Sequence, residues 1–331
     1  MIVLGIETSC DDTSAALFDG QSLISNVIST QLVHRSFGGV VPELASRNHI
    51  QLVLPVIKQA LNQGGISRKD LQGIAVTYGP GLAGSLLVGL SVAKGMALSL
   101  GIPFIGINHL DGHIWANLLD NPHIKTPFVV LIVSGGHTQI VLVKDWGVYK
   151  VLGKTRDDAA GEAFDKVGKL LKVGYPGGPA IEKLALKGDP TYIRFPRAFI
   201  ETGSLDFSFS GLKTSVLNHI RAIGSQNTQS RRCDIAVCFQ EAVIDVLVEK
   251  TANAAKQVGV HQICLAGGVA VNKALQERMT QRGREENLKV RWPSPGLCMD
   301  NGGMIARAGH HYLQQKMSSP LSLSPVPSLN F

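Results

Sequence analysis

The sequence is short of cysteine and of charged residues, and both shortages exclude classes of protein. Five Cys occur among 331 residues without a C-x-x-C pair, which argues against a disulfide framework and against a zinc ribbon. Charged residues are 17% and hydrophobic residues 44% of the chain, a composition that fills a large core and does not suit a disordered protein. We therefore expect a reduced, intracellular chain that is folded over most of its length.

Targeting, membrane and P-loop signals are missing too. The opening residues MIVLGIETSCDD have no basic region before the apolar one, so no secretory signal is expected. The most apolar stretch, residues 82–100, contains Lys94 and several Gly and Ser residues, which favours a buried helix over a membrane span. The pattern G-x-x-x-x-G-K-[ST] does not occur, which excludes a P-loop NTPase. We expect a cytoplasmic protein that binds no membrane.

Glycine, in contrast, is abundant, at 36 residues. It gathers in turns between segments that read as strands and helices. These turns are GPGLAGS (79–85), SGGHT (134–138), YPGGP (175–179) and AGGVAVN (266–272). Backbone N–H groups and the positive end of a helix dipole attract phosphate at such turns. Together, the turns predict a site for a phosphate or a nucleotide.

Two segments share one pattern of apolar and polar residues. In residues 3–18 and again in residues 128–143, an apolar run is followed by a polar turn and a second apolar run. Each segment reads as a pair of strands, and the recurrence predicts a duplicated architecture with one such unit opening each lobe. Two unrelated hairpins would give the same pattern.

Positive charge is concentrated late in the chain. The formal net charge is +7. Residues 1–108 hold six basic and six acidic side chains, and residues 109–331 hold 26 and 19. A basic part beside a neutral part is typical of a protein with a polyanionic partner such as nucleic acid. A basic surface without such a partner fits the charge count equally well.

His109 and His113 are the first candidates for chemistry. Their spacing of four places both imidazoles on one face of a helix expected from about Leu110, within reach of one metal ion. Leu110 stands where the H-E-x-x-H motif of a zinc peptidase has its general base, and Asp111 points away from that position. A pair of polar helix positions without a metal is the alternative.

The segment TRDDAAGEAFDKVGKLL is the second candidate. In a helix over residues 158–172, Asp158, Glu162 and Asp165 form an acidic stripe, which suggests a bound cation, a hydroxyl-rich ligand or a basic partner. Charge that complements the helix dipole would explain the first of these residues but not Asp165. Asp300 precedes another predicted helix, where a carboxylate either caps the helix or completes a metal site.

These segments occur together in one order. The motifs are ETSCDDTSAAL, GGVVPELASRNH, GPGLAGSLLVG, NHLDGH, VSGGHTQ, DDAAGEAFDK, YPGGP, FSFSGLKT, AGGVAVN and MDNGGMIA. Over residues 1–312 the chain resembles the bacterial TsaD family, the tRNA N6-adenosine threonylcarbamoyltransferases once labelled glycoproteases. The resemblance implies an α/β fold of the two-lobed actin-like, sugar-kinase-like ATPase type with duplicated mixed-sheet domains. We expect one lobe over residues 1–108 with 303–316, the other over 109–302, and a disordered Ser/Pro-rich tail over 317–331.

The resemblance also implies a metal site and a substrate site. The metal ligands of the family fall on His109, His113 and Asp300, a set that suits one divalent ion, Fe(II) in first place with Zn(II) as the alternative. Its substrate contacts fall on Ile132, Val133, Ser134, Gly135, Gly136, Asp165, Gly178 and Asn272. The chain differs from some members of the family at two positions. It has Asn108 where they have an additional His, and Asp12 where they have Glu.

The implied reaction is the transfer of a threonylcarbamoyl group from threonylcarbamoyl-AMP to the N6 amine of adenosine 37. The acceptor is the anticodon loop of a tRNA that reads codons beginning with A, and AMP leaves. Implied partners are a TsaB-like paralogue and a TsaE-like ATPase, with the adenylate made by a TsaC-type synthase. Three alternatives are a metalloendopeptidase, a sugar or acetate kinase and a non-catalytic scaffold. The missing base at Leu110 opposes the first, and the His, His and Asp ligand set opposes the other two.

Overall fold

The chain forms two compact units. The computed structural model describes residues 1–198 and 203–331, apart from the side chain of Arg35. One unit comprises Met1–Ile124 with Pro293–Phe331 and the other comprises Lys125–Trp292. The boundaries expected at 108/109 and 302/303 therefore fall inside the first unit. The reason is packing, because helix α3 (His109–Asp120) lies against helix α10 (Gly302–Gln314) and both belong to one core.

The first unit is built on a five-stranded mixed sheet in the order β3-β2-β1-β4-β5. Strands β1, β2 and β3 form an antiparallel meander, while β4 and β5 run parallel to β1. The strands are β1 (Val3–Glu7), β2 (Asp12–Phe18), β3 (Leu23–Thr30), β4 (Gly73–Gly79) and β5 (Phe104–Asn108). The other helices are η1 (Leu32–Phe37), α1 (Pro42–Gly64), η2 (Arg68–Asp70), α2 (Ala83–Leu100) and α9 (Pro295–Cys298).

The second unit repeats this topology in a sheet of order β10-β9-β6-β7-β8. Strands β6, β7 and β8 form the meander, and β9 and β10 run parallel to β6. The strands are β6 (Phe128–Val133), β7 (Thr138–Asp145), β8 (Val148–Lys154), β9 (Gln262–Ala266) and β10 (Lys289–Arg291). The helices are α4 (Ala160–Leu170), α5 (Gly177–Ala185), α6 (Ser210–Ser230), α7 (Arg232–Val258), η3 (Gly268–Val271) and α8 (Lys273–Glu285). The matching strand orders confirm the duplication predicted from the two hairpins.

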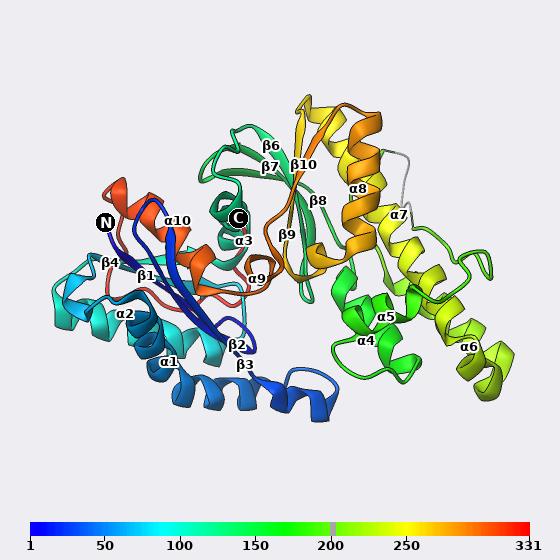
Figure 1. The fold of residues 1–331 in the computed structure, drawn as a ribbon, viewed down its shortest axis with the longest axis horizontal. Helices are drawn as coiled ribbons and strands as arrows, with labels where there is room; N and C mark the ends of the chain where they lie inside the picture. The colour runs from blue at the N-terminus through cyan, green and yellow to red at the C-terminus, as the bar shows by residue number, and fades with distance from the viewer. Residues whose placement is uncertain (199–202) are drawn as a thin grey trace. The chain divides into compact units, whose positions relative to one another are not determined.

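In the first unit, helices cover both faces of the sheet (Figure 1). Because side chains alternate along a strand, Leu4 and Ile6 on β1 point to one face, where they join a core with α1 and α2. Gly5 points to the other face, against α10. Strands β1, β2 and β4 are buried on both faces over nearly their whole length, which explains why apolar residues run almost without a break along β1.

Helix α2 is long and apolar enough by length and composition to cross a membrane, with 33% of its residues buried. Its buried positions, which include Leu86, Leu90 and Ala93, follow helical spacing and pack on α1 and β4. The Lys94 ammonium donates to the carbonyl oxygen of Leu323. The sequence predicts a buried helix here, and the structure has a helix that is buried along one face only.

The Ser/Pro-rich tail lies along the first unit. The Ser319 N–H donates to Phe104 O at 2.9 Å, and the Val326 N–H donates to Tyr78 O at 2.8 Å. Disorder was the expectation for residues 317–331, and these bonds contradict it. The composition of the tail is misleading because its main chain makes most of the polar contacts, and Ser319 Oγ also accepts the Gly106 N–H at 3.0 Å.

The tail also explains the GPGLAGS turn. A Cβ on Gly79 would lie 2.1 Å from Val326 O, so glycine is needed there for the tail to approach. The Gly81 N–H donates to Pro327 O at 3.1 Å, and the Leu82 N–H donates to Ser9 O at 2.8 Å. The prediction that this turn binds phosphate is therefore wrong for the N–H groups of Gly81 and Leu82, because both already donate to main-chain carbonyl oxygens.

The packing of the tail predicts a difference between two leucines. Leu323 packs on the core of the first unit and beside Gly106, whereas Leu321 is 53% exposed. Leu323→Ala is expected to lower the free energy of unfolding by about 1–3 kcal/mol, less than for a fully buried Leu. The control Leu321→Ala should change it by less than about 0.5 kcal/mol. Urea unfolding measures both, and equal effects would contradict the packed tail.

Candidate functional site

Helix α3 presents His109 and His113 on one face. Asn108 caps this helix, because its Oδ1 accepts the N–H of Leu110 at 2.9 Å. The ring centroids of the two histidines lie 4.7 Å apart, and both side chains are buried. The structure thus has the two imidazoles side by side, as the spacing of four predicts.

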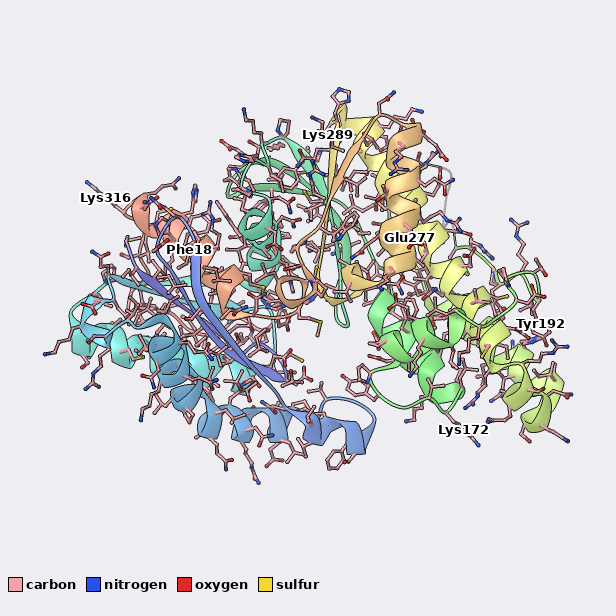
Figure 2. The ribbon with its side chains drawn as sticks, in the orientation of Figure 1. Phe18, Lys172, Tyr192, Glu277, Lys289 and Lys316 are labelled. Carbon is pink, nitrogen blue, oxygen red and sulfur yellow. The ribbon has the colours of Figure 1, made fainter. Side chains whose placement is uncertain are left out.

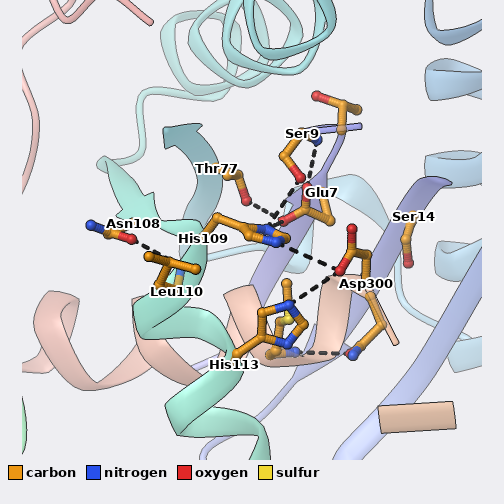
Figure 3. Close-up of polar contacts among 12 residues, drawn as sticks. Glu7, Ser9, Ser14, Thr77, Asn108, His109, Leu110, His113 and Asp300 are labelled. Carbon is orange, nitrogen blue, oxygen red and sulfur yellow. Dashed lines mark hydrogen bonds and ion pairs between the residues drawn. The ribbon is translucent and has the colours of Figure 1, made fainter. Parts of the chain in front are cut away.

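Asp300 reaches these histidines from the turn between α9 and α10. Helix α10 packs closely on β1 because Gly5 has no side chain, and a Cβ there would lie 2.2 Å from Gly302 O. Asp300 Oδ1 lies 3.2 Å from His113 Nε2 and 3.6 Å from His109 Nε2. One ligand atom from each of these three residues lies within 4.8 Å of the others. Figure 3 shows the three side chains converging.

This donor set fits a divalent metal. Both ring nitrogens of His113 are buried and have no hydrogen bond among the described residues, and Nε2 has only the approach of Asp300 Oδ1 at 3.2 Å. A bound cation would complete this arrangement. The Asp300 side chain keeps 24% of its surface exposed. Two imidazoles and one carboxylate leave coordination positions open, the pattern of catalytic rather than structural sites.

Glu7 orients the first of the two imidazoles. Its Oε2 lies 3.1 Å from His109 Nδ1, and Ser9 Oγ lies 3.2 Å from the same nitrogen. The Glu7 carboxylate is fully buried and is itself held by Thr77, whose hydroxyl donates to Oε2 at 2.5 Å. A carboxylate on the far ring nitrogen fixes the tautomer of a metal-binding histidine and raises its basicity. It leaves His109 Nε2 facing Asp300.

The electrostatics of this cluster favour a cation. Burial alone would lower the pKa of His109, but Asp300 and Glu7 outweigh it and raise the pKa to about 9. For Glu7, burial acts to raise the pKa, and the nearby His109 lowers it on balance. Burial, reinforced by Asp300, raises the pKa of Asp12 at the start of β2 to about 7. A pocket that favours a proton this strongly also attracts a metal ion that competes for the ring nitrogen.

In the second unit, the predicted substrate residues gather at one edge of the sheet. Ile132 and Val133 end strand β6, and the turn Ser134–Gly136 follows them. Strand β9 runs parallel beside β6, with Ile132 opposite Ala266, so the turn that leads to Asn272 begins at the same edge. The N-terminus of α4 closes on this edge, where the Gly161 N–H donates to Ser134 O at 3.1 Å.

Asp165 and Gly178 join this edge through the start of helix α5. Asp165 Oδ1 accepts the N–H of Gly177 at 2.7 Å. Further along α5, Glu182 Oε1 accepts the N–H of Lys273 at 2.8 Å. These bonds link α4 to α5 and α5 to α8, so segments far apart in the sequence are held together within the unit.

Asn272 caps helix α8 at the same edge. Its Oδ1 accepts the N–H of Leu275 at 2.9 Å, and its Nδ2 donates to Gln240 Oε1 at 2.9 Å. Both side chains are buried. All the substrate positions implied by the resemblance therefore lie on linked elements of the second unit.

The match to known proteins covers most of the chain. A family model described as TsaD, tRNA N6-adenosine threonylcarbamoyltransferase, matches residues 22–307. The chain belongs to the TsaD family. It is 54% identical over 328 residues to the tRNA N6-adenosine threonylcarbamoyltransferase of Syntrophus aciditrophicus, covering 98% of this chain and 96% of the relative. The enzyme of the same name from Desulfitobacterium hafniense is 52% identical over 330 residues, covering 99% and 97%.

A solved structure supports the fold of this TsaD family member independently. Component A of (R)-2-hydroxyglutaryl-CoA dehydratase from Acidaminococcus fermentans superposes with a TM-score of 0.59 at 14% identity, covering 96% of this chain and 100% of that one. At this identity the likeness concerns the fold alone. It bears out the predicted two-lobed actin-like architecture with duplicated mixed sheets.

The acidic stripe of this chain differs from the prediction. Helix α4 begins at Ala160 rather than Asp158, and Lys166 Nζ lies 2.7 Å from Asp158 Oδ1 and 2.9 Å from Glu162 Oε1. The first two acids of the stripe are thus neutralised by a lysine from the next turn. Only Asp165 points to the edge that holds the other substrate positions, because it faces the start of α5.

Sequence reasoning missed Glu7 and Gln240. Glu7 ends strand β1, whereas the polarity pattern of residues 3–18 places it at the start of the predicted polar turn. A glutamate directly after an apolar run is the signal that could have suggested a buried role. Gln240 lies among apolar residues of α7, and a buried amide in an apolar helix face marks a polar contact elsewhere in the fold.

Proposed function

We propose that this chain transfers the threonylcarbamoyl group from threonylcarbamoyl-AMP to the N6 amine of adenosine 37 in tRNAs that read codons beginning with A, releasing AMP. A transferase that modifies adenosine in tRNA follows from membership of the family. The proposal goes beyond family membership in three respects, which are the adenylate donor, the modified position 37 and the roles of the residues. The observation that carries it is the assembly of His109, His113 and Asp300 in a chain that aligns with threonylcarbamoyltransferases over its length.

Three glycines support adenylate binding in the second unit. Gly135, Gly136 and Gly178 have no atom within 4 Å of where a Cβ would stand. None of the three has positive φ. Neither packing nor backbone conformation therefore requires glycine at these positions. A flat, side-chain-free surface next to backbone N–H groups suits the close approach of a phosphate and a ribose.

Asp165 supports the same proposal from α4. One of its oxygens holds the Gly177 N–H, which keeps the Gly-Gly turn in place. We propose that the carboxylate also accepts a hydroxyl of the adenylate, which makes it a binding group rather than a general base.

The role of Asp165 predicts a graded effect. Asp165→Asn keeps an acceptor for Gly177 but loses the charge, and hydrogen bonds to charged groups contribute about 1.5–3 kcal/mol. Adenylate affinity should therefore fall roughly 10- to 150-fold. Equilibrium binding and single-turnover transfer are measured together, with Lys169→Ala on the exposed side of α4 as the control. Unchanged affinity with a slower chemical step would indicate a general base instead.

At the metal centre we propose one Fe(II) ion, with Zn(II) as the alternative, held by His109, His113 and Asp300. When bound, such an ion would act as a Lewis acid that polarises an acyl oxygen. An aromatic amine is a weak nucleophile, so the chain must also position it against the acyl carbon. Glu7 contributes by holding His109 Nδ1, which directs Nε2 toward the ligand position. The target base lies in a single-stranded loop, where it is accessible without opening a helix.

A metalloendopeptidase is the older reading of this family, and the site opposes it. Leu110 occupies the position of the general base, and Asp111 is engaged elsewhere, because its Oδ2 accepts the Tyr312 hydroxyl at 2.7 Å. No carboxylate on α3 is therefore placed to activate water beside the histidines.

We propose that the chain acts in the cytoplasm with a TsaB-like paralogue and a TsaE-like ATPase. Exposed apolar side chains on α1 and α2 support a protein partner. They are Ile50 (65% exposed), Leu54 (58%), Leu87 (54%) and Leu98 (70%). Large apolar groups gathered on paired helices are typical of an interface.

The test of the proposal is direct. Purified protein is incubated with threonylcarbamoyl-AMP, tRNA and the two partners, and the nucleosides are analysed by mass spectrometry. Threonylcarbamoyladenosine should form on tRNA with adenosine at position 37 and not on a transcript with guanosine there. Absence of the product with the complete set of partners would refute the proposal.

A further inference from the structure

Gln240 makes an unusual contact for its place in the fold. It lies on α7 and is 6% exposed, with Phe239 and Ala242 buried beside it in the chain. A buried amide is costly unless its polar atoms are paired. Its Oε1 accepts a hydrogen from Asn272 Nδ2 at 2.9 Å. Two buried amides from distant segments therefore meet at the edge where the substrate residues gather.

The hydrogen bonds fix the orientation of both amides. The Leu275 N–H is a main-chain donor, so the atom of Asn272 that faces it must be the oxygen. The nitrogen of Asn272 then faces Gln240, and the atom of Gln240 that faces it must in turn be its oxygen. A flip of either amide would bring two donors or two acceptors together. One N–H of Asn272 is used by Gln240, and the structure gives the other no acceptor among the described residues.

Capping of helix α8 does not account for this contact. Asn272 Oδ1 already accepts from Leu275, and Glu182 already accepts from Lys273. Gln240 touches only the donor side of Asn272, which takes no part in the cap. A residue that served the stability of α8 alone would not need an acceptor at that position.

We propose that Gln240 is a positioning residue, which directs the second N–H of Asn272 toward an acceptor oxygen of the adenylate. The inference rests on the proposed function, since it takes Asn272 as a substrate contact. Asn272 follows β9 at the edge that carries Ser134–Gly136, a suitable place for a donor to meet a phosphate, ribose or carbonyl oxygen. Gln240 itself need not touch the substrate.

A double-mutant cycle tests the inference. The variants are Gln240→Met, Asn272→Ala and the two combined, and the readout is affinity for a non-reactive adenylate analogue. Gln240→Met should weaken binding roughly 2- to 12-fold, the equivalent of one net hydrogen bond. In the Asn272→Ala background it should have no further effect, because the amide that it positions is gone. Binding of tRNA should stay unchanged.

Further readouts separate positioning from stability and the inference from the proposed function. The side-chain amide resonance of Asn272, assigned by its loss in Asn272→Ala, should shift in Gln240→Met without ligand. If Gln240→Met does not fold, Gln240→Asn is used in its place. Its side chain is one methylene shorter, which moves the acceptor oxygen away from Asn272. Additive effects of the two substitutions on affinity would overturn the inference and leave the proposed function standing. Full affinity in the Gln240 variant, together with weak binding by Asn272→Ala, would do the same. Full affinity in Asn272→Ala would overturn the substrate role of Asn272 and the inference with it.

Discussion

The double variant His109→Ala, His113→Ala is expected to bind no stoichiometric divalent metal while keeping its fold. It removes two of the three ligand atoms that lie within 4.8 Å of one another, and a single carboxylate does not hold a metal of this class in water. The fold should persist because α3 keeps its Asn108 cap and its buried apolar side chains, such as Ile114 and Trp115. Removal of the buried His113 Nδ1, which has no hydrogen bond among the described residues, offsets part of the lost packing.

Metal content per chain, measured after reconstitution with Fe(II) or with Zn(II), checks this expectation, and circular dichroism checks the fold. His123→Ala is the matched control, since His123 is an exposed histidine of the same unit. Its metal content should equal that of the original chain. A double variant that still carries about one ion per chain would show that the metal binds elsewhere.

The second large effect concerns salt. The unit Lys125–Trp292 holds 24 Lys and Arg against 16 Asp and Glu, a formal charge of +8, while the rest of the chain carries −1. Figure 2 labels Lys172 and Lys289, two exposed members of this basic unit. Neutralising 6–10 phosphates releases counterions, so tRNA affinity should fall about 10³- to 10⁵-fold between roughly 50 and 200 mM salt.

Titration of tRNA at several salt concentrations gives the slope directly. Adenylate binding supplies the internal control, because a small ligand with a single phosphate should respond far more weakly over the same range. A tRNA affinity that does not change with salt would remove the electrostatic argument and leave shape or base contacts as the source of binding.

Local patterns in the sequence predicted the parts of the fold and the site that depend on local geometry. The paired hairpins gave the duplication, because alternation of apolar residues is a property of each strand by itself. The spacing of His109 and His113 gave their common face, because four residues make about one helical turn. Resemblance to a family supplied Asp300 and the substrate positions, which no spacing relates to these histidines.

Tertiary packing decided what these patterns left open. Glu7 meets His109, and Gln240 meets Asn272, only because strands and helices distant in sequence pack side by side, and no periodicity along the chain encodes such a contact. The same holds for the tail, whose main-chain hydrogen bonds contradict its disordered composition, and for Lys166, which neutralises two acids of the stripe. The sequence by itself determined which side chains share an element and a face. Only packing between elements, where backbone close approach at positions such as Gly5 sets the distances, decided which of those faces meet.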